Sequence, residues 1–369
     1  VGAALPEGSQ YGADGGDRAL CDALTEKLAT INGLERQAVM VTAGANQAFV
    51  NLVFALCDAG DTAVIFAPYY FNHMMALQLS NLKPLVGPCS QDTMLPDVGW
   101  LREQFESGAG IRMVVLCNPC NPTGALAPRP LLDEISGLCR EHGCWLAVDN
   151  TYEDFVYAGA PGLEGSGGLA RRGTAEGHCC VAGPHVVNIF SFSKAYGMMG
   201  WRVGYLAYDD ADGLGDELLK VQDTVPICPP RLSQRVALAA LTSGGPAWVA
   251  ERVAESVLAN REAVVGAVCR ALGRGAVLGA PRGAIYVMVR LPPPPGAAAD
   301  SAADDAAAVR HLAEHHGVVV IPGGSCGAPG CIRIAFANLV PQACREAAAR
   351  LEEGLVALAA QAHGKAATG

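Results

Sequence analysis

The sequence is poor in charge, and basic charge is the scarcer kind. Only 17% of the 369 residues are charged, and 26 Lys and Arg stand against 36 Asp and Glu, which gives a formal net charge of −10. Nucleic-acid binders present a basic face, so this balance argues against nucleic acid as a partner. Apolar residues make up 51% of the chain, which allows a large buried core and excludes wholesale disorder.

Long apolar runs and metal-ligand spacings are also missing. Gly, Pro or charge breaks each apolar run before the ~18 residues that cross a bilayer, so we expect no membrane span. Cys117 and Cys120 form a CxxC pair without a second pair at zinc-ligand spacing, and His311 and His315 lack the Glu of HExxH. We therefore predict no metal site. The 14 cysteines are typical of reduced, buried thiols in an intracellular chain, here expected to be cytoplasmic.

Short apolar runs alternate with amphipathic stretches from about residue 38 onward. This alternation predicts an α/β fold with a mostly parallel central sheet covered by helices on both faces. After Pro229 a long helical stretch leads into short strands mixed with helices, which indicates a smaller α+β domain. We expect a large domain at residues 1–245, a long connecting helix at 246–272 and a small C-terminal domain at 273–369.

The expected elements follow from the same pattern. Gly-rich residues 160–178 and Pro- and Ala-rich residues 291–304 are expected to be mobile surface loops. Because the chain begins at Val1 and not at Met, we expect a fragment without its leader or N-terminal arm. Helices are predicted at residues 46–57, 130–142 and 247–272. Strands are predicted at residues 38–42, 62–66, 112–117, 144–148, 185–190, 202–207, 285–289, 318–321 and 331–335.

Lysine is rare enough to be informative. Only five of the 26 basic residues are Lys, and four of them, Lys27 among them, lie in ordinary contexts. Lys194 differs because it follows the apolar strand that ends at Phe190 and precedes a Gly-rich turn. Open α/β sheets place their ligand sites at the carboxyl ends of strands. Desolvation there lowers the pKa of a Lys and makes its amine a competent nucleophile, although a lone Lys is more often a surface residue.

Other polar groups follow strands in the same way. Asn121 follows the strand predicted at 112–117, and Asp149 and Tyr152 follow the strand predicted at 144–148. Alone, an Asn-Pro can be a turn and an Asp can be a helix cap. Together with Lys194 they place an amine, a buried acid and two hydrogen-bonding groups on one edge of one sheet.

An anion cradle is expected at the same edge. Gly44, Ala45 and Asn46 lie between a strand and a helix, so their amides would point at an anion, although such a sequence can also be only a tight loop. Arg202 adds a cation suited to bidentate phosphate binding. An amine, an acid and a phosphate cradle fit an aldehyde cofactor with a protonated ring nitrogen, which describes pyridoxal 5′-phosphate.

These motifs resemble those of the class I/II, fold type I, pyridoxal-phosphate-dependent aminotransferases. They occur in the order of that family and, with Tyr11, span roughly residues 11 to 340. The resemblance implies a fold type I transferase that uses amino acid and 2-oxo acid substrates in a ping-pong reaction. The matching motifs are Val41-Thr-Ala-Gly-Ala-Asn-Gln47, Ala67-Pro-Tyr-Tyr70, Asn118-Pro-Cys-Asn-Pro-Thr-Gly124, Asp149-Asn-Thr-Tyr152, Ser191-Phe-Ser-Lys194, Gly200-Trp-Arg-Val-Gly204 and Ile332-Arg-Ile-Ala-Phe336.

The resemblance assigns a role to each matching residue. Lys194 would bond to the cofactor aldehyde and shuttle the substrate proton, and Asp149 would pair with the ring nitrogen. Asn121 and Tyr152 would hydrogen-bond the 3′-oxygen. The remaining cofactor contacts would be a ring stack by Tyr70 and a phosphate site made of Gly44, Ala45, Asn46, Ser191 and Arg202.

Two further residues concern the substrate and the assembly. Arg333 is similar to the family Arg that clamps the substrate α-carboxylate, with Asn121 beside it. Tyr11 resembles the Tyr that reaches the phosphate of a neighbouring subunit, which implies a homodimer with shared active sites. Without the motifs, Arg333 would be taken for a surface ion pair and Tyr11 for core packing.

The stretches 41–60, 68–72, 178–181 and 191–205 look like a plant and algal subgroup of aromatic and methionine aminotransferases. The subgroup implies an aromatic amino acid or methionine as donor. A dicarboxylate would need a second buried cation, and the recognised motifs contain none beyond Lys194, Arg202 and Arg333. The alternatives are another specificity (aspartate, alanine or kynurenine), a C–S lyase or synthase on the same fold, and a regulatory module without turnover.

Overall fold

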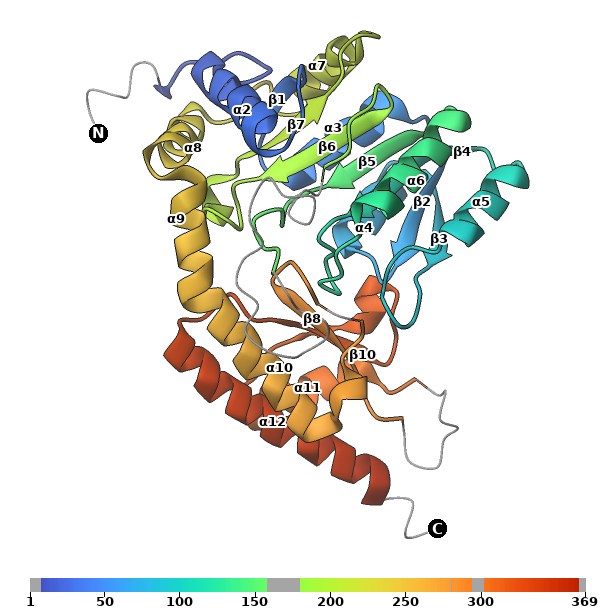
Figure 1. The fold of residues 1–369 in the computed structure, drawn as a ribbon, viewed down its shortest axis with the longest axis vertical. Coiled ribbons are helices and arrows are strands. Elements are labelled where there is room, and N and C mark those ends of the chain that lie inside the picture. The colour runs from blue at the N-terminus through green and yellow to red at the C-terminus, as the bar shows by residue number, and fades with distance from the viewer. Residues whose placement is uncertain (1–7, 158–179, 280, 294–301, 365–369) are drawn as a thin grey trace.

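The computed structural model describes residues 8–157, 180–279, 281–293 and 302–364. Its larger sheet has seven strands in the order β1-β7-β6-β5-β4-β2-β3 (Figure 1). The loop predicted at 160–178 and most of the loop predicted at 291–304 lie outside the described residues. The strands are β1 (Ala38–Thr42), β2 (Thr62–Ala67), β3 (Lys83–Pro88), β4 (Ile111–Cys117), β5 (Trp145–Asp149), β6 (Val186–Ser191) and β7 (Gly204–Tyr208).

The sheet is mostly parallel, which confirms the expected fold class. Neighbouring strands from β3 through β2, β4 and β5 to β6 all pair in parallel. β7 is antiparallel to both of its neighbours, β1 and β6. The parallel strands therefore bring their carboxyl ends to one edge of the sheet, where α/β sheets of this kind bind ligands.

Helices bury both faces of the sheet, as alternate side chains of β4 show. Met113 and Val115 pack in the same cluster as α3, α4 and α7, whereas Val114 and Leu116 pack with α5 and α6 on the opposite face. α2 and α8 cover that opposite face beside β1 and β7. These helices are α2 (Arg18–Ile31), α3 (Ala45–Leu56), α4 (Phe71–Leu79), α5 (Val98–Glu106), α6 (Arg129–Glu141), α7 (Leu214–Thr224) and α8 (Arg231–Ser243).

Short polar side chains begin several of the helices. The Asp17 carboxylate accepts a hydrogen bond from Ala19 N at 3.1 Å before α2, and Asp97 accepts one from Trp100 N at 3.0 Å before α5. Each bond satisfies one of the N–H groups that a first turn leaves unpaired. α3 differs, because Gly44 precedes it and provides no side-chain cap. Its first amides are therefore available to another acceptor.

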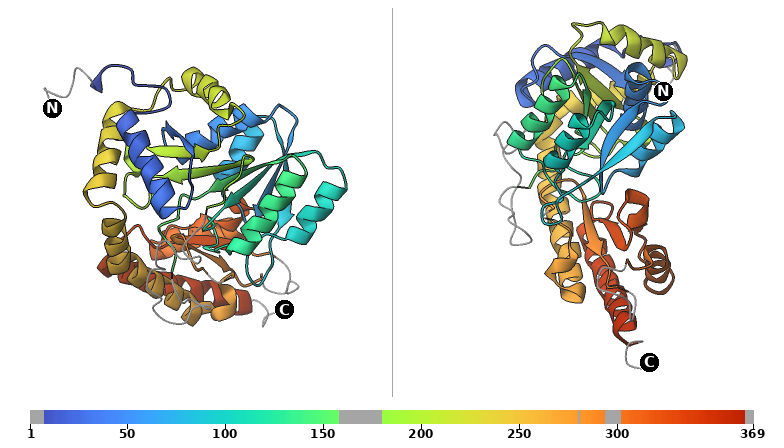
Figure 2. Two further views of the ribbon diagram at one scale, coloured as in Figure 1. Left: turned by 45° about the horizontal axis from the view of Figure 1, so that its top comes forward. Right: turned by 90° about the vertical axis from the view of Figure 1, so that its right-hand side faces the viewer.

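A second, three-stranded antiparallel sheet lies below the first in Figure 1. A continuous helical segment connects the two parts, and α12 packs along its lower half (Figure 2). This segment consists of α9 (Gly245–Arg252), one π-helical turn (Val253–Val257) and α10 (Leu258–Leu272). The small sheet and its helices are β8 (Tyr286–Arg290), β9 (Ile321–Pro322), β10 (Cys331–Ala335), α11 (Asp305–His316) and α12 (Pro341–Gly364).

Two predicted strands differ from the structure. The strand predicted at 202–207 begins only at Gly204, because Arg202 has a left-handed backbone (φ 54°) that does not fit a ladder. The strand predicted at 318–321 is β9 at Ile321–Pro322. The backbone at the expected start of this strand belongs to the end of α11 instead, because Val318 N donates to Leu312 O at 3.0 Å.

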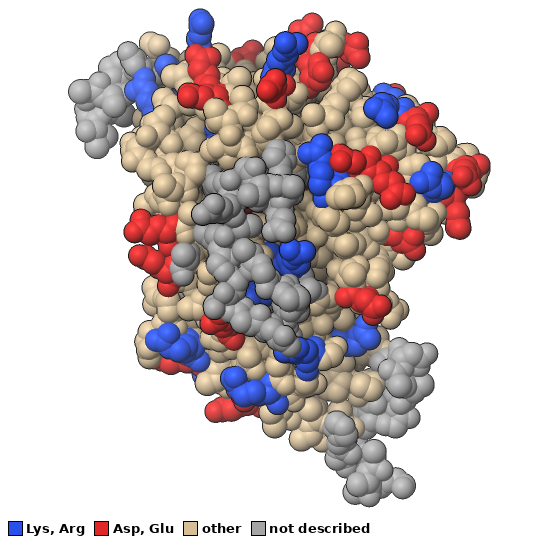
Figure 3. Space-filling view, viewed as in Figure 1, with Lys and Arg blue, Asp and Glu red and all other residues tan. Residues whose placement is uncertain are grey.

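The surface carries charges of both signs. On the face shown in Figure 3, basic and acidic side chains are interspersed. Within the described part of the chain, no helix is long and apolar enough to cross a membrane.

Candidate active site

Polar side chains meet where the parallel strands end. Tyr70 follows β2, Asn121 follows β4, Asp149 is the last residue of β5, and Lys194 follows β6. The structure brings most of the predicted residues to one cavity with a volume of about 170 Å3. The residues that line this cavity are Ala45, Asn46, Tyr70, Asp149, Thr151, Tyr152, Ser191, Ser193, Lys194, Met199 and Arg202.

The start of α3 forms an anion cradle together with Arg202. Gly44 has φ 91°, a conformation that favours glycine, and the amides of Ala45 and Asn46 open the helix behind it. A Cβ on Gly44 would collide with the Arg202 guanidinium, so these two groups are packed tightly. Arg202 itself is held by a hydrogen bond from Nη1 to Met199 O at 2.9 Å. Free amides, a helix N-terminus and a fixed guanidinium are suited to a phosphate.

The buried carboxylate of Asp149 also lines this cavity and contacts His73. Asp149 is 4% exposed, and its Oδ2 lies 3.1 Å from His73 Nε2. Its Oδ1 accepts a hydrogen bond from Thr151 N at 3.0 Å. Burial alone would raise the pKa of Asp149, but the bonds from His73 and Thr151 and the charge of His73 outweigh burial and lower it. Asp149 is therefore an anion inside the protein.

A chain of hydrogen bonds links the two sheets across the site. Arg333, on β10, donates from Nη1 to Asn121 Oδ1 at 2.9 Å. Asn121 Nδ2 donates to Tyr152 Oη at 3.4 Å, and that hydroxyl lies 2.8 Å from Tyr286 Oη. The Arg333 guanidinium also stands 4.5 Å from the ring centre of Tyr286. Its Nε is buried without a hydrogen-bond partner among the described residues.

Lys194 faces a second, larger cavity as well as the first. This cavity has a volume of about 480 Å3, and its wall includes Lys194, Met199 and Arg333. Much of the rest of the wall is apolar. Burial lowers the pKa of Lys194, and the charges of Arg333 and Arg202 lower it further. The amine is thus biased toward the neutral form that a nucleophile or a base needs. The apolar wall residues are Phe155, Val257, Ile285, Leu339 and Val340.

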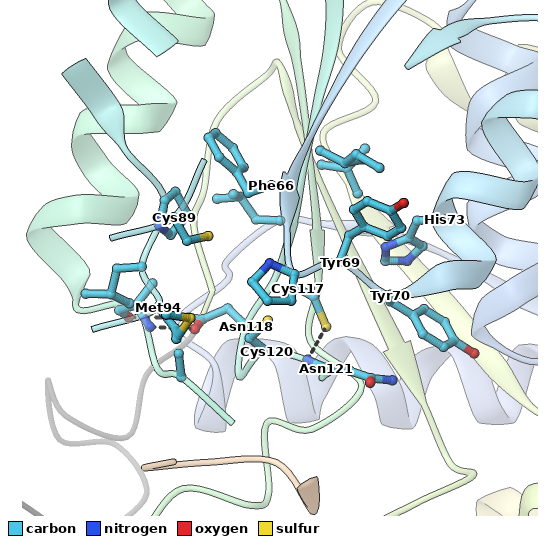
Figure 4. A pocket seen from close by; sticks show the side chains of 18 residues that line it. Phe66, Tyr69, Tyr70, His73, Cys89, Met94, Cys117, Asn118, Cys120 and Asn121 are labelled. Carbon is cyan, nitrogen blue, oxygen red and sulfur yellow. Dashed lines mark hydrogen bonds between the residues drawn. The ribbon is translucent and has the colours of Figure 1, made fainter. Parts of the chain in front are cut away.

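A small apolar cavity lies behind the site (Figure 4). It has a volume of about 40 Å3, and Tyr70 and Asn121 lie at one end of it. The thiols of Cys89, Cys117 and Cys120 line it, and Cys117 Sγ accepts a hydrogen bond from Asn121 N at 3.4 Å. Burial raises the pKa of all three thiols, so they act as neutral packing groups that support Asn121.

Tyr11 does not join the other predicted residues. Its side chain is 78% exposed, and it is absent from the described walls of both larger cavities. The resemblance assigned it to a neighbouring subunit, and an exposed hydroxyl is available for such a contact. The role of Tyr11 stays a prediction.

Sequence reasoning missed several residues of the site, among them His73, Tyr286 and Arg252. His73 lies one helical turn after Tyr70, and its ring packs edge-on against the Tyr70 ring with centroids 5.2 Å apart. Tyr286 is the first residue of β8. Arg252 reaches the larger cavity from α9. The spacing from Tyr70 to His73, close to one turn of a helix, was the available signal for His73.

Lys27 is a further correction, because its context is not ordinary. It is 7% exposed, forms an ion pair with Glu153, and donates to Tyr205 Oη at 3.1 Å. Its ammonium also lies 4.6 Å from the ring centre of Phe190. A position in the amphipathic helix α2 gave no sign that this side chain points into the protein.

A family model described as aminotransferase class I and II matches residues 5–351. The aromatic aminotransferase ISS1 of Arabidopsis thaliana is 48% identical over 350 residues, which cover 94% of this chain and 82% of that protein. A bifunctional aspartate aminotransferase and glutamate/aspartate-prephenate aminotransferase of Petunia hybrida is 29% identical over 369 residues, covering 96% of this chain and 72% of that protein.

Solved structures give a similar result. The aromatic aminotransferase of Pyrococcus horikoshii OT3 superposes with a TM-score of 0.80 at 26% identity, covering 96% of this chain and 90% of that chain. The aspartate aminotransferase of Thermus thermophilus with maleate gives a TM-score of 0.79 at 26% identity, covering 95% of this chain and 86% of that chain.

Proposed function

Since the chain belongs to the class I and II aminotransferase family, we propose that it transfers an amino group between an aromatic amino acid or methionine and a 2-oxo acid. The chain is an aminotransferase of fold type I, as its motifs predicted, and this family is pyridoxal-phosphate-dependent. Identity of 48% to a plant protein named an aromatic aminotransferase supports the substrate class.

One observation carries the proposal at the level of the site. A desolvated amine, Lys194, lines one cavity with a buried anion, Asp149, and a second cavity with Arg333, an arginine on the other sheet whose Nε has no partner among the described residues. The first two groups suit an aldehyde cofactor with a protonated ring nitrogen. The third suits the carboxylate of an amino acid.

The residues present fit pyridoxal 5′-phosphate. The cradle of Gly44, Ala45 and Arg202 leaves no room for a Cβ at Gly44, but it offers amides and a guanidinium to a phosphate. Asp149 lines the same cavity as Ala45 and Arg202. In the proposed arrangement Tyr70 would pack on the ring, and Asn121 and Tyr152 would hydrogen-bond its 3′-oxygen. The phosphate would be held by Gly44, Ala45, Asn46, Ser191 and Arg202.

The chain's own groups then have defined tasks. When bound, the cofactor supplies the aldehyde that takes up the amino group and the electron sink for the substrate carbanion. Lys194 Nζ takes the proton from substrate Cα and later returns one, which its lowered pKa favours. Asp149 keeps the ring nitrogen protonated through its negative charge. Arg333 orients the substrate by its carboxylate.

The larger cavity supports a large apolar substrate side chain. Phe155, Ile285 and Val340 give it apolar walls beside Lys194 and Arg333. Arg252 also lines it, which the motifs did not predict. Its Nη2 is, however, engaged with the backbone carbonyls of Lys194 and Ala195. A dicarboxylate would leave its second carboxylate among apolar groups, which disfavours binding by several kcal/mol.

A half-reaction screen tests the function. Purified, cofactor-loaded protein is mixed with phenylalanine, tyrosine, tryptophan, methionine or aspartate, and the conversion of the cofactor to its amine form is followed by absorbance. We expect at least one of the first four to have a higher kcat/KM than aspartate. Equal or better use of aspartate than of all four would contradict the aromatic or methionine specificity.

Product analysis distinguishes amino-group transfer from a C–S lyase reaction on the same fold. One amino acid and one 2-oxo acid are supplied together, and both products are measured. Stoichiometric exchange of the amino group supports transfer, whereas release of ammonia and a thiol from a sulfur amino acid would indicate a C–S lyase. A homodimer with shared sites and a cytoplasmic location stay part of the proposal.

A further inference from the structure

Arg252 joins the connecting helix to the turn that carries Lys194. Its Nη2 donates to Lys194 O at 3.0 Å and to Ala195 O at 2.7 Å, although these segments lie 58 and 57 residues apart. The turn wraps closely around the guanidinium, because a Cβ on Gly197 would lie 3.2 Å from Arg252 Nη1. The Arg252 side chain of α9 therefore holds the backbone carbonyls of two successive residues, Lys194 and Ala195.

Packing alone does not explain an arginine at this position. Its Nε is buried without a hydrogen-bond partner among the described residues, and burial lowers the pKa of its guanidinium. The guanidinium also lies over the ring of Trp248, with the ring centre 5.2 Å from Cζ. An apolar side chain of the same length would fill this space without the desolvation penalty of a guanidinium. The two carbonyl contacts are what an apolar side chain could not provide.

The helix changes its geometry directly after Arg252. Val253–Val257 forms a π-helical turn, in which Ser256 Oγ donates to Arg252 O at 2.8 Å. An extra residue in a helix rotates the faces on its two sides by about 100° relative to each other. α9 can therefore aim Arg252 at the Lys194 turn while α10 packs on α12.

We propose that Arg252 is a positioning residue for Lys194, an inference that rests on the proposed function of Lys194. It acts through the backbone. The charges that lower the pKa of the Lys194 amine come from Arg333 and Arg202, and Arg252 is not among these causes. Loss of Arg252 should therefore displace the amine from the substrate Cα without changing its charge.

Three variants test this inference. Arg252→Met removes the donors but keeps the length, and Arg252→Lys keeps a charged donor. Arg270→Met is the matched control, since Arg270 is an exposed arginine of α10 whose ion pair with Glu352 lies outside both cavities. Hydrogen exchange of the amides at residues 194–198 is measured on the cofactor-free protein. The steady-state kcat and KM for phenylalanine, the borohydride-trapped fraction of Lys194 and the Tm are measured on the loaded protein.

We expect Arg252→Met to speed exchange in this turn by about tenfold, as for the loss of one to two net hydrogen bonds. Its kcat should fall by about 10²-fold, the effect of a misplaced catalytic group, while KM changes less than about threefold. Because Nη2 alone makes both bonds, an ammonium can replace it. Arg252→Lys should therefore restore kcat to within about tenfold of the parent and restore slow exchange.

The other outcomes overturn the inference. Unchanged exchange and kcat in Arg252→Met would mean that Arg252 only packs. A higher KM confined to dicarboxylic substrates would mean that it binds substrate directly. If Arg252→Met does not fold, Arg252→Lys decides, and fast exchange at a normal Tm in that variant contradicts positioning. If the parent and Arg270→Met transaminate no amino acid, the proposed function fails, while exchange on the cofactor-free chains still decides the role of Arg252.

Discussion

Among single residues, the Asp149 carboxylate shows how burial and pairing combine. It is buried, which alone would raise its pKa, but the hydrogen bonds of His73 and Thr151 and the charge of His73 outweigh desolvation and lower the folded-state pKa. A carboxyl with a depressed folded pKa contributes stability above its unfolded pKa. This contribution is fully present above the ordinary value of 3.8 and is lost as the pH falls through the lower folded value. The contacts that lower the pKa of Asp149 should therefore stabilise the folded protein at pH 7.

Replacing His73 tests that conclusion. His73→Phe fills the same space beside Phe49 but leaves Asp149 without its partner. We expect the cofactor-free variant to lose about 3 kcal/mol of unfolding free energy at pH 7, as for a broken buried ion pair. The difference from the parent should shrink as the pH falls toward the lowered folded pKa of Asp149 in the parent, because without His73 the buried carboxyl takes up its proton at a higher pH. Urea unfolding of both proteins at pH 7 and pH 3 measures this difference in unfolding free energy. A loss that is equal at both pH values would show that His73 acts by packing alone.

At the scale of elements, the start of α3 serves the cofactor site more than it serves the helix. Gly44 provides no side-chain cap, and its left-handed backbone lets Arg202 pack directly against the first turn. The anion cradle is thus a shared property of a helix N-terminus and of the turn before β7. Changing the glycine should disturb Arg202 without unfolding α3.

Gly44→Ala and Gly60→Ala form a matched pair for this point. Both glycines have a positive φ, 91° and 94°, which L residues rarely adopt, so both variants bear backbone strain of roughly 1–3 kcal/mol. A Cβ on Gly60 meets nothing within 4 Å, whereas one on Gly44 collides with the Arg202 guanidinium. We expect Gly44→Ala to raise the Kd for pyridoxal 5′-phosphate at least about tenfold, and Gly60→Ala to leave it unchanged. Fluorescence titration gives both values. Equal affinities would remove Arg202 from the phosphate site.

Helix α2 is anchored to the loop after β5 by a buried ion pair. Lys27 contacts Glu153, which directly follows Tyr152, and Asn32 Nδ2 donates to the same carboxylate at 2.5 Å. Lys27→Met should destabilise the protein by about 3 kcal/mol because it leaves the largely buried carboxylate of Glu153 without its cation. Lys220→Met, at an exposed pair, should change stability by no more than about 0.5 kcal/mol. Thermal unfolding compares the stability of the two variants with that of the parent. A second change, Glu153→Gln, should recover part of the loss, and no recovery would contradict the charge argument.

The contrast between Lys194 and Lys27 shows what the sequence could predict. Lys194 follows an apolar strand, and the carboxyl ends of parallel strands meet at one edge, so local order along the chain predicts its place in the site. Lys27 lies on a helix, where the choice between an outward and an inward side chain depends on what packs against that helix. The ion pair of His73 with Asp149 likewise joins α4 to β5, and Arg252 reaches Lys194 from 58 residues away. Contacts between distant elements of this kind leave little trace in a single sequence.

At the scale of the whole molecule, the site lies where two sheets meet. Lys194 and Asp149 come from the seven-stranded sheet, and Arg333 comes from the three-stranded one. The helical segment from Gly245 to Leu272 connects the two parts (Figures 1 and 2). Any motion of one sheet against the other therefore changes the distance between the proposed carboxylate clamp and the proposed base. Arg252 lies on this connecting segment and bonds the backbone at Lys194, so the proposed base stays attached to the connecting helix.

In the proposed homodimer, Tyr11 of one chain contacts the cofactor phosphate of the other chain. Tyr11 is 78% exposed and is absent from the described walls of its own chain's cavities, so a phosphate contact would have to be made in a second copy. Loss of one hydrogen bond to a charged group disfavours binding by about 1.5 kcal/mol. We therefore expect Tyr11→Phe to raise the cofactor Kd about tenfold in the homodimer.

Mixed dimers separate a contact between subunits from a contact within one. Lys194→Ala should fold but have no turnover, because its amine is missing. In a dimer of one Lys194→Ala chain and one Tyr11→Phe chain, the site with an intact Lys194 receives an intact Tyr11 only from its partner. At limiting cofactor we expect such a dimer, purified through two different tags, to show about half of the parental kcat per dimer, since one of two sites is complete. If Tyr11 acts within its own chain, that site lacks the hydroxyl, and the mixed dimer would retain the weak cofactor binding of Tyr11→Phe.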